Sequence, residues 1–180
     1  MHAQRPGPIG RCRWERKRVK GISPMNMELS QIKASLLKPS AVFRGQFEFS
    51  GFVQDLTGAV RRHYHGTIGC ALDGNVLTLD EDLFFNDGAE EKRMWTIDEG
   101  RDAISGEAGD LVGRAIIEPI SRDEMRWRYV MQIEIGGKRR PFDFEDVFVQ
   151  TKDDTMISKT TMKKFGVPLA RLYSSYRQIG

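Results

Sequence analysis

Four charged side chains of this sequence could do chemistry if the fold brings them together: Glu81, Arg93, Asp110 and Asp146. Two carboxylates on facing strands are the groups used in glycoside hydrolysis and in general acid–base catalysis. A guanidinium beside carboxylates can instead recognise a polar ligand or close a purely structural network of charges. The residue types therefore leave three interpretations open: catalysis, ligand recognition and a structural plug.

A predicted β-hairpin over residues 77–97 places two of these four residues opposite each other. Its first strand alternates, and one apolar face is formed by Leu77, Leu79, Leu83 and Phe85. The turn is Asn86-Asp87-Gly88, where Gly88 can take a positive φ at no steric cost. This register pairs Phe85 with Ala89, Leu79 with Trp95 and Leu77 with Ile97. Glu81 then faces Arg93 on the apolar side, where two charges are costly unless they pair or serve a ligand.

The same alternation directs further polar and aromatic side chains toward the interior. The predicted ligand-binding residues are Tyr64, Glu81, Arg93, Trp95, Asp110, Trp127, Tyr129 and Asp146. Small residues near them are expected to leave volume unfilled, namely Gly66, Gly106, Ala108, Gly113 and Ala115. An Asp73-Gly74 turn is expected to set Cys70 opposite Leu77, and Gly66 opposite Glu81. Aromatic walls with a few convergent polar groups are typical of pockets for small molecules.

A metal site is suggested at most by His63 and His65, because residues two apart on a strand share a face. Their parity is opposite to that of Tyr64, so we expect them on the outer face, and no third ligand is evident. Cys12 and Cys70 are too few for a zinc site or a disulfide framework. The sequence contains no G-x-S-x-G, HExxH, P-loop or Rossmann motif. We therefore predict no metal and no cofactor, and we assign no catalytic residue.

Short strands are the elements that must hold these residues. From Phe43 onward, about eight to ten alternating segments follow one another, joined by tight turns such as Gly136-Gly137. No strand–helix–strand unit appears among them. The pattern predicts an all-β fold, a single antiparallel up-and-down β-barrel, because closure removes the edge strands that a flat sheet exposes. A two-sheet sandwich is the alternative.

The start of the chain differs from the rest in composition. Residues 1–24 hold seven Lys and Arg against Glu15, a net charge of +6, which leaves −3 of the overall +3 for the remainder. Without periodicity, residues 1–26 are expected to be a flexible, disordered basic extension. A passive extension, or a natural start at Met25 or Met27, is favoured over an arm that binds nucleic acid or an anionic membrane. Residues 27–180 form the predicted barrel domain, which begins with a short helix over Met27–Lys38 that Pro39 ends.

Several separate motifs carry a resemblance to a known family. In order, they are LTLDEDLFFNDG…RMW, GEAGDLVGRA, WRY, FEDVF and MISKTTMKKFGV. With this order and spacing, the chain from Phe43 to Arg177 resembles the bacterial domain-of-unknown-function family 3833. The resemblance implies a small lipocalin-like β-barrel, and many members are envelope lipoproteins. This sequence shows no lipidated leader, and Ser158-Lys159 stands where members have Asn-Arg.

The family has no assigned activity, so the expected function follows from the residues. We expect a non-enzymatic module that holds a small amphipathic or apolar molecule inside the barrel. A hydrolase-type enzyme using the inward carboxylates, and a structural protein with a solid interior, are the alternatives. No apolar run is long enough to span a bilayer. No secretory signal or lipobox precedes Cys12, so we expect a cytoplasmic protein.

Overall fold

The computed structural model describes residues 36–100, 102–152 and 154–180. The described residues all belong to one compact unit, Ser35–Gly180. The expected basic extension over residues 1–26, the boundary after it and most of the helix expected over Met27–Lys38 lie outside the described residues. No helix in the described part of the chain is long and apolar enough to cross a membrane.

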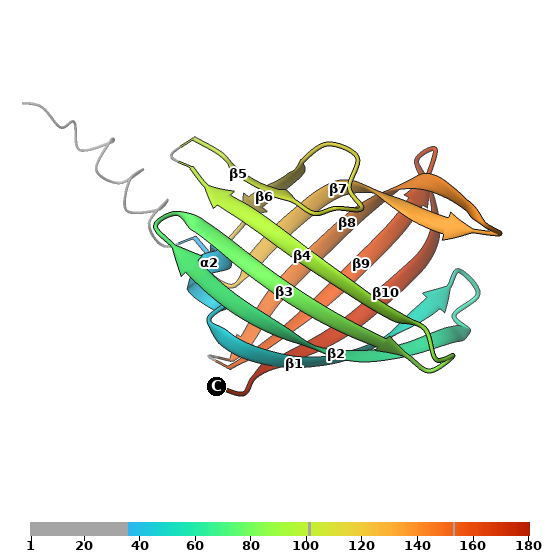
Figure 1. Ribbon diagram of the computed structural model, residues 1–180, viewed down its shortest axis with the longest axis horizontal. Helices are drawn as coiled ribbons and strands as arrows, with labels where there is room; N and C mark the ends of the chain where they lie inside the picture. Colours follow the sequence, from blue (N-terminus) through green and yellow to red (C-terminus); the bar gives the residue numbers. More distant parts are fainter. Residues whose placement is uncertain (1–35, 101, 153) are drawn as a thin grey trace, which may run out of the picture. The chain divides into compact units, whose positions relative to one another are not determined.

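Ten antiparallel strands of the described region close into one barrel, in which each strand pairs with the next and β1 pairs with β10 (Figure 1). The strands are β1 Gly45–Asp55, β2 Val60–Asp73, β3 Val76–Phe85, β4 Glu90–Glu99, β5 Ile104–Glu107, β6 Ala115–Pro119, β7 Glu124–Ile135, β8 Lys138–Lys152, β9 Thr155–Lys164 and β10 Val167–Gln178. The predicted up-and-down barrel is confirmed. The sandwich alternative is wrong, because the sheet has no open edge between β1 and β10.

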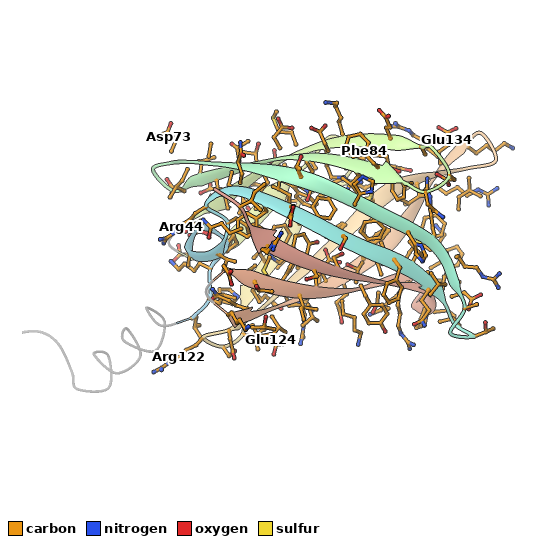
Figure 2. All side chains as sticks on the ribbon, turned by 90° about the horizontal axis from the view of Figure 1, so that it is seen from below. Arg44, Asp73, Phe84, Arg122, Glu124 and Glu134 are labelled. Atoms are coloured by element: carbon orange, nitrogen blue, oxygen red, sulfur yellow. The ribbon has the colours of Figure 1, made fainter. Side chains whose placement is uncertain are left out.

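Period-2 alternation produces the two surfaces of the barrel wall. In β8, for example, Phe142, Phe144, Asp146 and Phe148 are buried, while the residues between them are more exposed. β7 behaves in the same way, with Met125, Trp127 and Met131 buried. Because successive side chains point to opposite faces of a strand, each strand contributes one face to the interior and one to solvent. Figure 2 shows charged residues such as Asp73 and Glu134 at opposite ends of the barrel.

A short helix, α2 Pro39–Val42, lies at the end of the barrel where β1 begins, which we call the helix end (Figure 1). Pro39 begins this helix, whereas the sequence pattern placed it as a helix stop; a proline is well tolerated in the first turn, where its missing N–H has no partner anyway. Ser40 fastens α2 to the end of β4, since its backbone N–H and its hydroxyl donate to the Glu99 carboxylate at 2.7 and 2.8 Å. Phe43 follows α2 and is buried in the barrel.

The register of the β3–β4 hairpin is the predicted one, with Glu81 opposite Arg93, Leu79 opposite Trp95 and Leu77 opposite Ile97. The Phe85 N–H donates to the Ala89 carbonyl at 2.9 Å, which closes the turn.

The β2–β3 register differs from the prediction by two residues. Asp73 pairs with Val76, so the loop is Gly74-Asn75, and Gly74 adopts a φ of +60°. Cys70 consequently faces Leu79, and Gly66 faces Leu83, not Glu81. A slip of two residues preserves which side chains point inward, so the assignment of faces survives.

The wall is built differently where β4 meets the rest of the barrel. In the described chain, β4 pairs with β5 from Thr96 to Glu99, and the β4 residues 90–95 have no strand partner on that side. The connection between β5 and β6 bonds instead to β7, through Val112 N–H to the Val130 carbonyl and Gln132 N–H to the Asp110 carbonyl, both at 2.8 Å. We call the line between residues 90–95 and this connection the seam.

Candidate functional site

A cavity of about 340 Å³ lies inside the barrel. It extends from Phe43 at the helix end to Arg62 and Glu91 near the opposite end, which we call the hairpin end. Most of its wall is apolar or aromatic, and its lining includes Phe49, Ile68, Leu79, Leu83, Phe85, Phe144, Phe148, Met162, Leu172 and Tyr176. A volume of this size is many times the roughly 30 Å³ that one water occupies in the liquid. The interior is therefore not packed solid.

Seven of the eight predicted site residues line this cavity: Tyr64, Glu81, Arg93, Trp95, Trp127, Tyr129 and Asp146. They come from five strands, because β2, β3, β4, β7 and β8 each turn an inward position toward it. The eighth, Asp110, does not line the cavity. It lies in the connection between β5 and β6, where the strand parity used for the prediction does not apply.

Arg93 is surrounded by carboxylates. Its Nε donates to Asp110 Oδ2 at 2.9 Å, its Nη1 lies 3.7 Å from Glu81 Oε2, and its Nη2 lies 3.4 Å from Glu91 Oε2. The Arg93 side chain is 16% exposed. Burial alone would lower its pKa, but Glu81 and Asp110 outweigh burial and raise it. Arg93 is therefore charged in the folded protein, and its closest partner is Asp110, where the sequence pointed to Glu81.

Of these three carboxylates, Glu81 lies farthest from the Arg93 guanidinium. The 3.7 Å separation is longer than a hydrogen bond. Burial raises the pKa of Glu81 from 4.5 to about 7, against the opposing effects of Arg93 and of the Trp95 indole. Near neutral pH this side chain is therefore only partly ionised, and perturbed pKa values of this kind cluster at functional sites.

Asp146 is held by hydroxyl groups and forms no ion pair with another described residue. The Tyr129 hydroxyl donates to Asp146 Oδ2 at 2.9 Å. Burial raises the pKa of Asp146 to about 6, although hydrogen bonds from Thr160 and Tyr129 oppose the rise. The pKa of Tyr129 is raised well above its usual value, first by its own burial and then by the Asp146 charge. Tyr129 is consequently a neutral donor throughout the physiological range.

An aromatic cluster covers the wall beside these acids. The rings of Trp95 and Trp127 meet edge to face with centroids 5.4 Å apart, and Trp95 meets Tyr129 in the same way at 5.3 Å. Trp127 is the direct cross-strand partner of Asp146. The Trp127 indole N–H has no hydrogen-bond partner within the described residues. The cluster thus presents aromatic surface and an unused donor close to a carboxylate.

Tyr64 closes another part of the wall. Its hydroxyl passes over Gly51 of β1 and lies 2.7 Å from Ser174 Oγ on β10, and burial raises its pKa. Tyr176 and Ser158 form a longer contact of 3.5 Å between their hydroxyl oxygens. These serines of β9 and β10 are therefore engaged with tyrosine hydroxyls.

The small residues do not create the cavity, contrary to expectation. None of the five expected small residues lines it. At Gly66, a Cβ atom would lie 2.0 Å from the Asp82 carbonyl oxygen and 2.7 Å from the Phe49 ring. At Gly106, a Cβ would meet Ile97 and Trp95 at 3.5 Å. The glycines instead allow close approach of backbone and rings, and the cavity volume lies between the longer side chains.

Arg62 is a cavity residue that the sequence analysis did not select. Its guanidinium carbon lies 3.4 Å from the Phe85 ring centroid, and it pairs with Asp87 at 2.8 Å. Arg62 shares the inward parity of Tyr64, and this parity could have identified it from the sequence as a cavity residue. The contributions of β9 and β10, among them Thr160 and Ala170, were also missed, because inward polar residues such as Ser158 and Thr160 obscure the alternation there.

His63 and His65 lie exposed on the outer face of β2, as predicted. Within the described ranges, no group of three or more His, Cys, Asp or Glu side chains is placed to hold a metal ion.

The fold and the cavity define a closed antiparallel β-barrel with an internal space lined by aromatic and charged groups. The chain belongs to the family described as "Protein of unknown function (DUF3833)", whose family model matches residues 17–178. The resemblance inferred from the motifs is thereby confirmed, and the barrel agrees with the architecture it implied. No curated protein matches the chain in sequence.

Similar solved structures include designed and natural proteins. A de novo designed fluorescence-activating beta barrel is 12% identical with a TM-score of 0.40, covering 79% of this chain and all of its own. EF1p2_mFAP2b bound to DFHBI is 7% identical with a TM-score of 0.44, covering 78% and 96%. The S-type phycobiliprotein lyase CPES from Guillardia theta is 6% identical with a TM-score of 0.49, covering 76% and 88%.

Proposed function

We propose that this protein binds one small apolar or amphipathic molecule inside its barrel. The observation that carries the proposal is the cavity of about 340 Å³, lined mainly by apolar and aromatic side chains with a few polar groups converging on it. Small-molecule sites generally have this composition and a volume of about 300–1,000 Å³. A barrel of this kind either fills with side chains or holds one ligand. The unfilled volume favours the second.

An enzymatic function has less support. The raised pKa values of Glu81 and Asp146 suit acid–base chemistry. The interior serines Ser158 and Ser174 are, however, bonded to tyrosine hydroxyls, and the histidines of the described region lie outside on β2. A nucleophile activated by a neighbouring base is therefore not assembled in the described cavity. Binding explains the apolar walls, which hydrolysis does not need.

A cavity-filling substitution tests the proposal. Ala170 lines the cavity and is 9% exposed, so Ala170→Leu places extra methyl groups in empty space. Ala71 on the outer face of β2 gives a matched control, Ala71→Leu. A neutral environment-sensitive dye such as Nile red should bind the wild-type protein saturably. We expect Ala170→Leu to weaken this binding at least tenfold without lowering the melting temperature, and Ala71→Leu to leave it unchanged. Equal dye affinity in all three proteins contradicts binding in the cavity.

A further inference from the structure

The two arginines that line the cavity are already neutralised from outside it. Arg62 forms a two-point contact with Asp87, at 2.8 Å to Oδ2 and 2.9 Å to Oδ1. Arg93 donates to Asp110 Oδ2 at 2.9 Å. Neither aspartate lines the cavity. The positive charge available to a ligand is therefore small, although two guanidinium groups stand in the wall.

Glu81 and Asp146, the two buried acids of the cavity, have no hydrogen-bonded cation of this kind within the described residues. Glu81 reaches Arg93 at 3.7 Å, and Asp146 is bonded by the neutral Tyr129 hydroxyl. Burial raises the pKa values of both acids, and it outweighs the opposing effect of Arg93 on each of them. A carboxylate ligand would add a further negative charge to this space and would meet repulsion. A cation would supply what the two acids lack.

The aromatic cluster adds a second, independent reason. Trp95, Trp127 and Tyr129 all line the cavity, next to the two acids. Trp95 lies close enough to Glu81 for its indole to lower that pKa, and Tyr129 is bonded to Asp146. Aromatic faces attract cations through their quadrupole, most strongly where water is excluded, and cages of aromatic residues recognise ammonium groups. Carboxylates combined with aromatic faces in one apolar cavity form a receptor for an organic cation.

We propose that the ligand of this cavity is an apolar molecule bearing a protonated amine, with its ammonium group placed between Glu81 and Asp146 against the Trp95, Trp127 and Tyr129 rings. This inference rests on the proposed function, since it names the chemical class of the molecule that the barrel holds. A cavity that binds fatty acids would differ from this one, because a carboxylate head group needs a cation that the protein has not already neutralised.

Three ligands that share one alkyl chain test the inference: decylamine, decan-1-ol and decanoate. Each competes with Nile red for the full-length protein at pH 8, below its micelle concentration. At this pH Glu81 and Asp146 are mostly ionised, and an alkylamine, whose pKa resembles the roughly 10.4 of lysine, remains protonated. We expect decylamine to bind at least tenfold more tightly than decan-1-ol, and decanoate to bind most weakly. Decanoate binding as tightly as decylamine overturns the inference.

Two neutral substitutions identify the acids responsible. Glu81→Gln and Asp146→Asn should each weaken decylamine at least fivefold and leave decan-1-ol within twofold of wild type. The matched control is Glu145→Gln, which changes the neighbour of Asp146 that pairs outside with Lys163. An amine preference that persists in both cavity variants, or that falls equally in the control, overturns the assignment. Failure of all three ligands and of the dye refutes cavity binding itself, whereas tight decan-1-ol binding without amine preference refutes this inference alone.

Discussion

Arg93 Nε and Asp110 Oδ2 are joined at 2.9 Å across the seam, where β4 and the connection between β5 and β6 share no backbone hydrogen bond in the described chain. This side-chain ion pair connects two neighbouring segments of the barrel wall, which backbone hydrogen bonds connect elsewhere. Because the Arg93 side chain is only 16% exposed, this contact is shielded from the solvent screening that weakens surface ion pairs.

Removal of Arg93 should therefore destabilise the barrel strongly. Arg93→Met leaves Glu81 and Asp110 without their cation, and we expect a loss of about 3–5 kcal/mol in the free energy of unfolding. A double-mutant cycle in urea should give a larger coupling energy with Asp110→Asn than with Glu81→Gln, because Asp110, unlike Glu81, is within hydrogen-bond distance of Arg93. Lys92→Met is the control, since its pair with Asp82 is mostly exposed and should be worth about 0.2–1 kcal/mol. A larger coupling with Glu81 contradicts the observed geometry.

The stability of the folded protein should fall as the pH rises from weakly acidic to neutral. The pKa of Glu81 is raised from 4.5 to about 7, and that of Asp146 from 3.8 to about 6. A carboxyl with a raised pKa binds more protons when folded than unfolded, so its stabilising contribution is present below the unfolded pKa and is lost as the pH rises through the folded pKa. The rise in the Glu81 pKa corresponds to a loss on the order of 3 kcal/mol in the free energy of unfolding. This value is an upper bound, because Glu81 and Asp146 titrate as a coupled pair.

Melting temperatures between pH 4.5 and pH 8 measure this effect. Glu81→Gln should flatten the decline, and Asp146→Asn should do so over a slightly more acidic range. The other titratable groups that interact with Glu81 are Arg93, Asp110, Asp146, Tyr64, Tyr129, Tyr176 and Cys70. Arg93 and the tyrosines do not change charge in this window, because their pKa values are all raised. Stability that increases steadily from pH 5 to pH 8, and equally in Glu81→Gln, contradicts a buried Glu81.

Two glycines on one strand should respond differently to the same substitution. A Cβ at Gly66 would lie 2.0 Å from a backbone oxygen and 2.7 Å from the Phe49 ring, whereas a Cβ at Gly69 has nothing within 4 Å. Gly66→Ala should therefore cost at least about 1–3 kcal/mol through overpacking. Gly69→Ala should stay within about 0.5 kcal/mol of wild type. Urea unfolding of both variants decides the point, and a tolerated Gly66→Ala contradicts the packing of Phe49 over this glycine.

The sequence predicted best where strand parity and one strong turn agree. The β3–β4 hairpin has a single strong turn at Asn86-Asp87-Gly88, so its register and the inward direction of Glu81, Arg93 and Trp95 were predictable. The β2–β3 turn offered two adjacent solutions, Asp73-Gly74 and Gly74-Asn75, and local turn preference does not choose between them.

Other features depend on contacts that parity cannot specify. Asp110 lies in a connection with no strand period, so its bond to Arg93 arises from the tertiary fold alone. The effect of Gly66 depends on where the Phe49 ring lies, which alternation does not determine. The separation of Glu81 from Arg93, 3.7 Å instead of a hydrogen bond, is likewise a matter of competition between Glu81 and Asp110 for one guanidinium.

The seam also has a kinetic consequence. Residues 90–95 of β4 gain backbone hydrogen bonds from β3 alone, so alternate amides on their other side depend on solvent, and they should exchange with deuterium much faster than amides within β7 and β8. A surface groove of about 630 Å³ runs along this line, and Arg62, Glu91 and Arg93 line both the groove and the cavity. Parting the wall here breaks side-chain contacts and leaves the backbone ladders intact. The barrel can thus open locally along the seam beside β4 while its other strands remain paired.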